Sequence, residues 1–411
     1  MNKGIDILVA VERNKIPIGQ KHKLHLLIKV RGISNGQQQR RPLNLGFVLD
    51  RSGSMEGSKL DYTRQAVELC MTHLDENDIQ SIVIFDHEVE MLMAPTKLVN
   101  KDMAKKVLQK VWARGTTNLS AGLIMGGNLV GHNSSDERIN RVLVLTDGQA
   151  NQGITSADGL ATIAGKIGDR GIGVTSLGVG ADFDEEVLIG IAEAGRGNFY
   201  YIENPDQIPA IFEQELEGLL QVLAQKLEIS IDSPYLTKAY GYIPEVTEKG
   251  FNFALPDLYS GEEKVLVLEM ELPAMQSGTQ KLVNIKVSYF DTFSMQEQIV
   301  EVPVDIFAGD IEQIGDADAN PEVEKHLRRL RMAEAQNEAL SKADEGDFDS
   351  ARELLKEVVA EMLPMMADED ELTELDQLQE SIKYYSDEQY NQSTRKKIRA
   401  ASYRQQKNRP R

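Results

Sequence analysis

Between residues 43 and 222, short apolar runs alternate with segments whose apolar positions recur at helical spacing. The apolar runs predict strands at residues 45–49, 79–85, 89–94, 142–146, 174–179 and 197–202. The segments between them predict helices at residues 59–74, 101–112, 120–129, 158–168, 185–194 and 205–224. Strands that alternate with helices form parallel sheets with helices on both faces. The fold class is therefore α/β, with a doubly wound, mostly parallel, Rossmann-like sheet.

On both sides of this region, apolar side chains alternate with polar ones at a period of two, the spacing of half-buried strands. Residues 1–40 hold two such segments, and residues 225–308 hold several more, of which Val283, Ile285 and Val287 are an example. The later segment has too few strands for a complete sandwich, so we expect residues 1–40 to complete it. The domain at residues 43–222 would then be inserted into a β-sandwich.

Helical spacing returns in residues 310–392, for which we predict a C-terminal hairpin or bundle. Its helices are expected at residues 323–343, 348–363 and 368–386. The first two resemble one tetratricopeptide-like hairpin, but a single hairpin lacks the recurring period of that repeat, which favours a plain helical hairpin. Residues 393–411 are rich in Lys and Arg and have no apolar period. They predict a disordered basic tail that docks on an acidic partner, on nucleic acid or on the chain's own acidic helices.

Charge and cysteine content narrow the classes of function. The 411 residues carry 45 Lys and Arg against 65 Asp and Glu, a net charge of −20. An acidic molecule repels phosphate backbones, so nucleic acid is not an expected partner apart from a weak role of the basic tail. The single cysteine, Cys70, excludes an internal disulfide and a multi-thiolate zinc site. The acidic run at residues 368–371 is expected to be a solvated helix start, favoured by the helix dipole.

The sequence also bears on location. It has no stretch of about 18 uncharged apolar residues of the kind that spans a membrane. Its first residues are interrupted by charges and lack the apolar core of a secretory signal. We therefore expect a cytoplasmic protein without a transmembrane segment.

Candidate chemistry gathers where the predicted parallel strands end. Asp50 and Asp147 directly follow two of these strands, Ser52 and Ser54 alternate on the loop after Asp50, and Thr117 precedes a helix. The carboxyl ends of parallel strands meet in one crevice, where ligands bind. Carboxylates and hydroxyls without thiolate or imidazole select hard cations, so Mg²⁺ is the leading candidate, with Mn²⁺ or Ca²⁺ as alternatives.

These motifs resemble the metal-ion-dependent adhesion site of von Willebrand factor type A domains over residues 43–222. The matching parts are Asp-x-Ser-x-Ser at 50–54, Gly-Thr-Thr-Asn-Leu at 115–119 and Thr-Asp-Gly at 146–148. The resemblance implies five metal ligands, directly or through water: Asp50, Ser52, Ser54, Thr117 (with Thr116 as the fallback) and Asp147. The flanking layout is similar to bacterial proteins of the inter-alpha-trypsin inhibitor heavy chain or calcium-activated chloride channel-like type.

The function that follows is a non-enzymatic protein-interaction module. A partner protein would present an Asp or Glu to the divalent cation, and the closing helix at residues 205–224 would couple the site to the β domain. No small-molecule substrate is expected. One alternative is a regulatory or substrate-delivery subunit of a MoxR-type AAA+ ATPase or chelatase machine. A metal-dependent hydrolase is the other, although the pattern offers no evident base.

Two further groups of residues are expected to have structural roles. Asp86 and His87 follow a predicted strand on the crevice side, and a surface loop is favoured over a role in choosing the partner. The aromatic residues that we expect to pack in the core are Trp112, Tyr200 and Tyr201.

Overall fold

The computed structural model describes residues 4–33, 40–97, 101–314, 318–366 and 368–408. The chain divides into two compact units. The first, here called the α/β unit, comprises Ser34–Lys226 and Asp291–Gln296. The second, here called the sheet-and-helix unit, comprises Met1–Ile33, Leu227–Phe290 and Glu297–Arg411.

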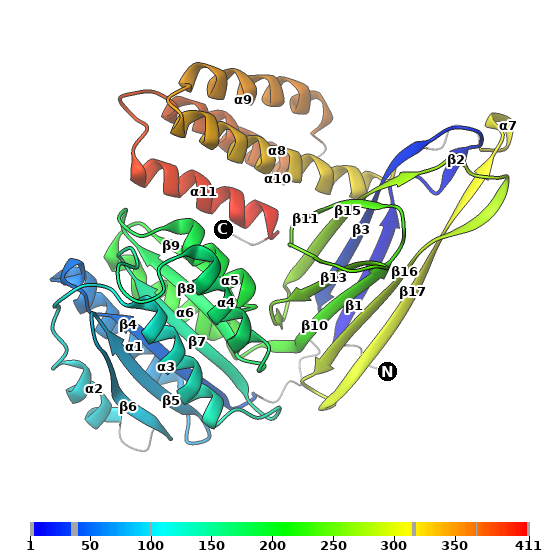
Figure 1. Ribbon diagram of the computed structural model, residues 1–411. Coiled ribbons are helices and arrows are strands. Elements are labelled where there is room, and N and C mark those ends of the chain that lie inside the picture. Colours follow the sequence, from blue (N-terminus) through cyan, green and yellow to red (C-terminus); the bar gives the residue numbers. More distant parts are fainter. Residues whose placement is uncertain (1–3, 34–39, 98–100, 315–317, 367, 409–411) are drawn as a thin grey trace. The chain divides into compact units, whose positions relative to one another are not determined.

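A six-stranded sheet in the order β6-β5-β4-β7-β8-β9 forms the centre of the α/β unit (Figure 1). Its strands are β4 (Leu43–Asp50), β5 (Ile79–Phe85), β6 (Val89–Lys97), β7 (Ile139–Thr146), β8 (Gly173–Val179) and β9 (Phe199–Ile202). All neighbours are parallel except β6, which is an antiparallel edge strand. Every residue of β4 and β7 is buried, as expected for central parallel strands covered on both faces. The predicted α/β class is confirmed.

Helices cover both faces of this sheet. They are α1 (Ser58–His73), α2 (Lys101–Leu108), α3 (Leu119–His132), α4 (Ala157–Gly168), α5 (Glu185–Ala194) and α6 (Ile208–Leu219). Phe47 and Val48 are successive residues of β4, and their side chains point to opposite faces of the sheet. Phe47 stacks on Phe212 of α6, with ring centroids 6.3 Å apart. Val48 instead meets α3, where a Cβ added to Gly126 would lie 2.3 Å from the Val48 side chain. Glycine at this position therefore lets α3 approach the sheet.

The predicted closing helix at residues 205–224 is wrong at its C-terminal end. Helix α6 ends at Leu219, and β10 (Val222–Asp232) begins three residues later. Within β10, Leu227, Ile229 and Ile231 are buried at alternate positions. The first four residues of β10, from Val222 to Gln225, are all buried, so apolar positions that suggested a helix belong to a strand with both faces covered.

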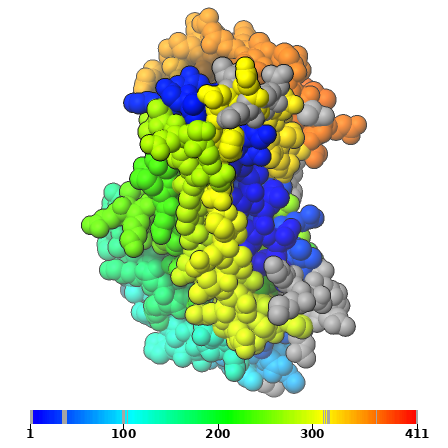
Figure 2. All heavy atoms as spheres, turned by 90° about the vertical axis from the view of Figure 1, so that its right-hand side faces the viewer, coloured from blue at the N-terminus to red at the C-terminus, as the bar shows by residue number. Residues whose placement is uncertain are grey.

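The sheet-and-helix unit contains two sheets, and segments distant in sequence pair within them. The first sheet has the order β1-β3-β15-β11 and the second the order β12-β13-β10-β16-β17-β2, with β14 paired to β10. Strands β3 and β15 lie on opposite sides of the α/β unit in sequence, yet they pair antiparallel with Leu27 opposite Val267. Figure 2 shows the N-terminal segment beside the strand in yellow, in agreement with the parallel pairing of β2 and β17. The bounds are β1 (Ile5–Val11), β2 (Lys15–Pro17), β3 (His22–Gly32), β11 (Leu236–Tyr240), β12 (Glu245–Val246), β13 (Gly250–Leu255), β14 (Leu258–Tyr259), β15 (Glu263–Leu272), β16 (Gly278–Asp291) and β17 (Gln296–Gly309).

Helices follow the last strand. They are α7 (Ile311–Ile314), α8 (Pro321–Asp344), α9 (Phe348–Met362), α10 (Glu369–Ser381) and α11 (Gln392–Gln406). Helix α8 packs on the first sheet, where Val323, Leu327 and Leu330 join a cluster with Leu27 and Val267. Among the described residues, no helix combines the length and apolar character needed to cross a membrane.

The prediction of a disordered basic tail is wrong for the described part of residues 393–411, because most of it forms α11. Ile398 and Tyr403 of this helix are buried, and the Ser402 hydroxyl donates to the Ala333 carbonyl of α8 at 3.0 Å. The Arg395 guanidinium donates to the Asp344 carboxylate at 2.9 Å. Of the docking sites considered for these residues, the chain's own acidic helices are the one observed. Residues 409–411 lie outside the described residues.

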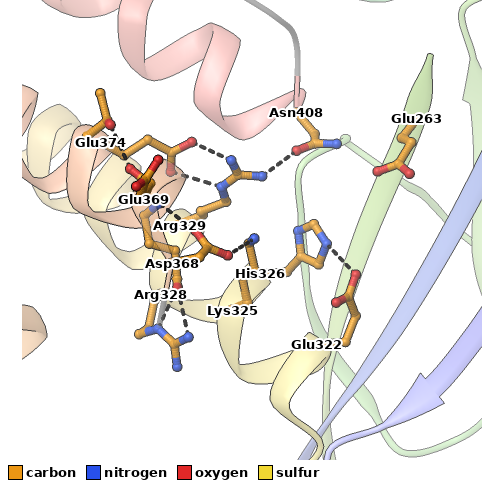
Figure 3. A network of polar contacts seen from close by, with 12 residues as sticks. Glu263, Glu322, Lys325, His326, Arg328, Arg329, Asp368, Glu369, Glu374 and Asn408 are labelled. Carbon is orange, nitrogen blue, oxygen red and sulfur yellow. Dashed lines mark hydrogen bonds and ion pairs between the residues drawn. The ribbon is translucent and has the colours of Figure 1, made fainter. Parts of the chain in front are cut away.

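The acidic start of α10 also differs from the expected solvated run. Figure 3 shows the basic face of α8 directed at these carboxylates. Lys325 bonds Asp368, and the Arg328 Nη2 atom lies 2.8 Å from Glu371, whose side chain is fully buried. Asp368 also caps α10 by accepting from the Glu371 amide at 2.9 Å. Only tertiary contact with a basic helix explains why Glu371 is buried.

The buried His326 on α8 predicts a pH-dependent stability. Burial, together with the charge of Lys29 of β3, lowers the pKa of His326 to about 4, although Glu322 at 3.6 Å opposes this. As the pH falls below about 6.5, the unfolded chain takes up a proton that the folded chain excludes until about 4. We therefore expect the free energy of unfolding to fall by up to about 3 kcal/mol across this window. Denaturant melts at pH 7 and pH 5 should show a smaller difference for His326→Gln, and an equal difference would contradict the assignment.

Candidate metal centre

The five sequence-predicted ligands lie at the carboxyl edge of the central sheet. Asp50 ends β4, and Asp147 directly follows β7, its neighbour in the sheet. Ser52 and Ser54 lie on the loop that leads from β4 towards α1, and Thr117 lies just before α3. The Ser54 residue is exposed, whereas the other four residues are at most 3% exposed. The set therefore has a buried base and one solvent-facing member.

Asp50 is a buried carboxylate held by neutral donors. Its Oδ1 atom accepts from the Ser52 amide at 2.7 Å, and its Oδ2 atom accepts from the Thr146 hydroxyl. Burial, with a smaller contribution from the charge of Asp147, raises the pKa of Asp50 to about 6, although these hydrogen bonds oppose the rise. Among the described residues, no cationic side chain forms an ion pair with Asp50. The site thus contains a negative charge that an added cation would neutralise.

Asp147 connects the two serines with helix α1. Its Oδ1 atom accepts from the Ser54 hydroxyl at 2.6 Å, and the two serine hydroxyl oxygens are 3.2 Å apart. The Lys59 ammonium of α1 donates to the Oδ2 atom of Asp147. Lys59 therefore supplies one positive charge to a pair of buried carboxylates, which leaves the pair incompletely balanced.

Thr117 joins the same group through its own loop. Its amide donates to the Asn151 side chain at 2.8 Å, and its carbonyl accepts from the Asn151 and Gln152 amides. A Cβ added to Gly148 would lie 3.3 Å from the Thr117 hydroxyl oxygen and 3.5 Å from that of Ser54. The hydroxyls of Thr117 and Ser54 therefore both lie next to Gly148, where the missing side chain leaves space between them. The fallback residue Thr116 is exposed.

Asp86 has a role that sequence reasoning missed. The expected surface loop is wrong for this residue, because it is fully buried and accepts from the Nε atoms of Arg51 and Arg114, each at 2.8 Å. Its backbone carbonyl also accepts from the Asn118 amide at 2.8 Å. Burial alone would raise the pKa of Asp86, but hydrogen bonds from the Glu88 amide and Arg114 outweigh it and hold the pKa below its ordinary value. Asp86 therefore ties together the two loops that carry the serines and Thr117.

The aromatic residues predicted to pack in the core differ from expectation in one case. Trp112 is 62% exposed, so its predicted packing in the core is wrong. Tyr201 is half-buried with its ring centroid 6.0 Å from that of Phe183, and the Tyr200 hydroxyl donates to the buried Glu215 at 2.8 Å. His87 is the exposed neighbour of Asp86, with its Nδ1 atom 3.0 Å from the Asp86 carboxylate.

The donor chemistry suits a hard divalent cation. The five predicted ligands offer only oxygen atoms, two as carboxylates and three as hydroxyls. Oxygen ligands of this kind bind Mg²⁺, Mn²⁺ and Ca²⁺ in preference to softer metals. Two carboxylates that share a buried site repel each other unless a positive charge lies between or beside them. The residues present therefore fit a divalent cation.

Comparison with known proteins agrees with this fold. The family model of the von Willebrand factor type A domain matches residues 44–214. The uncharacterized protein sll0103 of Synechocystis is 27% identical over 299 residues, which cover 68% of this chain and 69% of that protein. Human inter-alpha-trypsin inhibitor heavy chain H4 is 25% identical over 287 residues, 66% of this chain but only 30% of the human protein.

A solved structure covers both units. The von Willebrand factor type A protein from Catenulispora acidiphila aligns with a TM-score of 0.75 over 97% of this chain and 96% of that chain, at 13% identity. Such a likeness shows a shared fold. The family model confirms the expected von Willebrand factor type A domain at residues 44–214, while the intact adhesion site stays a prediction.

Proposed function

We propose that the carboxyl edge of the α/β sheet is a metal-ion-dependent adhesion site that binds an Asp or Glu of a partner protein. Asp50, Ser52, Ser54, Thr117 and Asp147 would hold the cation, directly or through water. The observation that carries the proposal is the pair of buried carboxylates, Asp50 and Asp147, beside hydroxyls that reach solvent at Ser54. Family membership at residues 44–214 supports the same function.

The chain's own residues have separable tasks in this proposal. The bound cation would supply a positive centre that attracts a partner's carboxylate. Asp50 contributes charge from the buried base of the site, while the exposed Ser54 marks the side from which a partner can approach. Since a carboxylate–cation contact is strong only where the geometry is fixed, loops tied by Asp86 would give the site its selectivity.

The direct experiment is capture of partners with the full chain in the presence of Mg²⁺, followed by crosslinking and mass spectrometry. We expect a set of partner proteins that is lost with EDTA and lost again with Asp50→Ala. Crosslinked peptides should contain Asp or Glu near the site. Capture that survives both EDTA and the substitution would contradict the proposal.

Replacing Lys59 should strengthen cation binding. The Lys59 ammonium pairs with Asp147, so it competes with a divalent cation for the same carboxylate. We expect Lys59→Met to bind Mn²⁺ roughly threefold to tenfold more tightly, since like charges within a few ångströms repel. Isothermal titration calorimetry measures this, with the exposed Lys166→Met on α4 as the matched control. Unchanged or weaker affinity would show that Lys59 does not compete with the cation.

Other predictions accompany this proposal. We favour Mg²⁺ in a cytoplasmic, non-enzymatic protein, and the regulatory-subunit alternative would be supported by co-purification of an AAA+ ATPase. We also propose that the N-terminal strands and the strands after the α/β unit form one β-sandwich, which the pairing of β3 with β15 in one sheet and of β2 with β17 in the other supports. Coupling through α6 would be supported if Leu219→Ala, at a buried position, changed partner affinity without unfolding the chain.

A further inference from the structure

A groove lies between α9 and the C-terminal end of α10 in the sheet-and-helix unit. Its volume is about 470 Å³, within the range of ligand sites. Val359, Ala360 and Ile382 line it with apolar surface, and all three are half-buried or exposed. Helices α9 and α10 contact each other. The groove is separate from the candidate metal centre, which belongs to the α/β unit.

Positive charge gathers on this groove although the chain is strongly acidic. Arg352, Lys356 and Lys383 line it, and no carboxylate is found among its described lining residues. On helix α9, Glu353, Glu357 and Glu361 are exposed and do not line the groove. Arg352 forms an ion pair with Asp349 of the same helix, so the excess positive charge of the groove comes from Lys356 and Lys383. In a chain with a net charge of −20, such a local excess of cations focuses attraction for anions.

The cations differ in how they are engaged. The Arg352 Nη1 atom donates to the Tyr385 carbonyl at 2.5 Å, which ties α9 to the segment after α10 and fixes the groove's two walls. Lys383 lies over the Tyr384 ring, with its Nζ atom 5.3 Å from the centroid. Within the described part of the chain, neither Lys356 nor Lys383 forms an ion pair. Their charges are therefore available to a ligand.

We infer that this groove binds an acidic segment of a partner protein, with an apolar side chain against Val359 and Ile382 and flanking carboxylates on Lys356 and Lys383. The apolar lining requires an apolar group in the ligand, which a sugar–phosphate backbone does not provide. The charge of the chain as a whole also disfavours nucleic acid. An acidic peptide with an apolar residue satisfies both features of the groove.

The test uses the full chain and three fluorescein-labelled peptides in fluorescence anisotropy. The first peptide alternates Asp or Glu with Leu, the second replaces every Leu with Ser, and the third replaces every acid with Lys. A single-stranded oligonucleotide of similar length serves as a polyanion that carries bases in place of aliphatic side chains. We expect saturable binding of the first peptide alone, because the groove needs both charge and apolar contact.

Variants then locate the binding. Lys356→Glu combined with Lys383→Glu should weaken binding of the first peptide by about tenfold or more, because the replaced charges repel it. Val359→Ser should weaken the same peptide without changing the residual response to the oligonucleotide. The exposed Lys249→Glu, outside the groove, makes the same type of charge change and should have no effect.

Each other outcome overturns the inference. Equal binding of the Ser-containing peptide or the oligonucleotide would reduce the groove to a non-specific cationic surface. Equal losses with Lys249→Glu would assign the effect to net charge. The absence of saturable binding by the first peptide would exclude an acidic apolar segment as the occupant.

Discussion

Asp50→Ala should abolish the rise in melting temperature that Mg²⁺ or Mn²⁺ gives the unaltered protein. A ligand that binds only the folded state stabilises it by about 2.7 kcal/mol at 100 times its dissociation constant. Asp50 is the fully buried carboxylate at the base of the proposed site, and only neutral donors contact it among the described residues. Its removal takes away charge that the cation would otherwise neutralise. Thermal melts with saturating metal and with EDTA measure the difference.

Asp50→Asn separates the loss of metal binding from the loss of structure. The amide keeps an oxygen that can accept from the Ser52 amide, but it removes a charge whose burial raises the pKa of Asp50 to about 6. In EDTA we expect this variant to be at least as stable as the unaltered protein, while its response to metal disappears. The exposed Asp387→Ala controls for general charge loss. A full metal response in either Asp50 variant would remove Asp50 from the site.

The α/β unit was predictable because its signals are local. Each strand of the parallel sheet is a short apolar run, and Asp50 and Asp147 directly follow two such runs that pair with each other in the sheet's centre. The rule that parallel strands direct their carboxyl ends to one edge then brings both acids together without further information. Their assignment as metal ligands stays a prediction until a metal is measured.

The errors made for the charged segments near the C-terminus have one physical cause, which is tertiary contact between those segments. The basic residues of α11 are helical because α8 offers both an apolar surface and the carboxylate of Asp344. Glu371 is buried because Arg328 comes from a helix more than forty residues earlier in the chain. Neither partner can be read from the local pattern, in which charge runs are typical of solvent-exposed or disordered segments.

The role of Asp86 beside the candidate site also depends on tertiary contacts that its own stretch of sequence does not indicate. Its sequence neighbours, His87 and Glu88, are exposed and suggest an ordinary loop. The sequence does contain one signal for the role of Asp86, which is Arg51 at the variable position of Asp-x-Ser-x-Ser. An arginine beside a buried site needs a buried acid as its partner. Arg51 is 4% exposed and points its Nε atom at Asp86.

Asp86→Ala should destabilise the α/β unit by about 3–5 kcal/mol, the usual cost of removing one partner from a buried ion pair. Arg51 and Arg114 would each lose a hydrogen bond of 2.8 Å, and the Glu88 amide would lose its acceptor at 2.7 Å. For a unit of this size, such a loss lowers the melting temperature by roughly 10 °C. Thermal melts in EDTA measure this effect without any contribution from metal.

The same variant should also weaken Mn²⁺ binding, because Asp86 holds the loops of Ser52 and Thr117 in register. Glu88→Ala is the matched control, since Glu88 pairs with the same Arg114 at 2.8 Å but is exposed, and an exposed pair contributes at most about 1 kcal/mol. If Asp86→Ala melted like Glu88→Ala, the buried ion pairs would not stabilise the unit. If it lost stability but kept full Mn²⁺ affinity, Asp86 would support the fold without positioning the metal ligands.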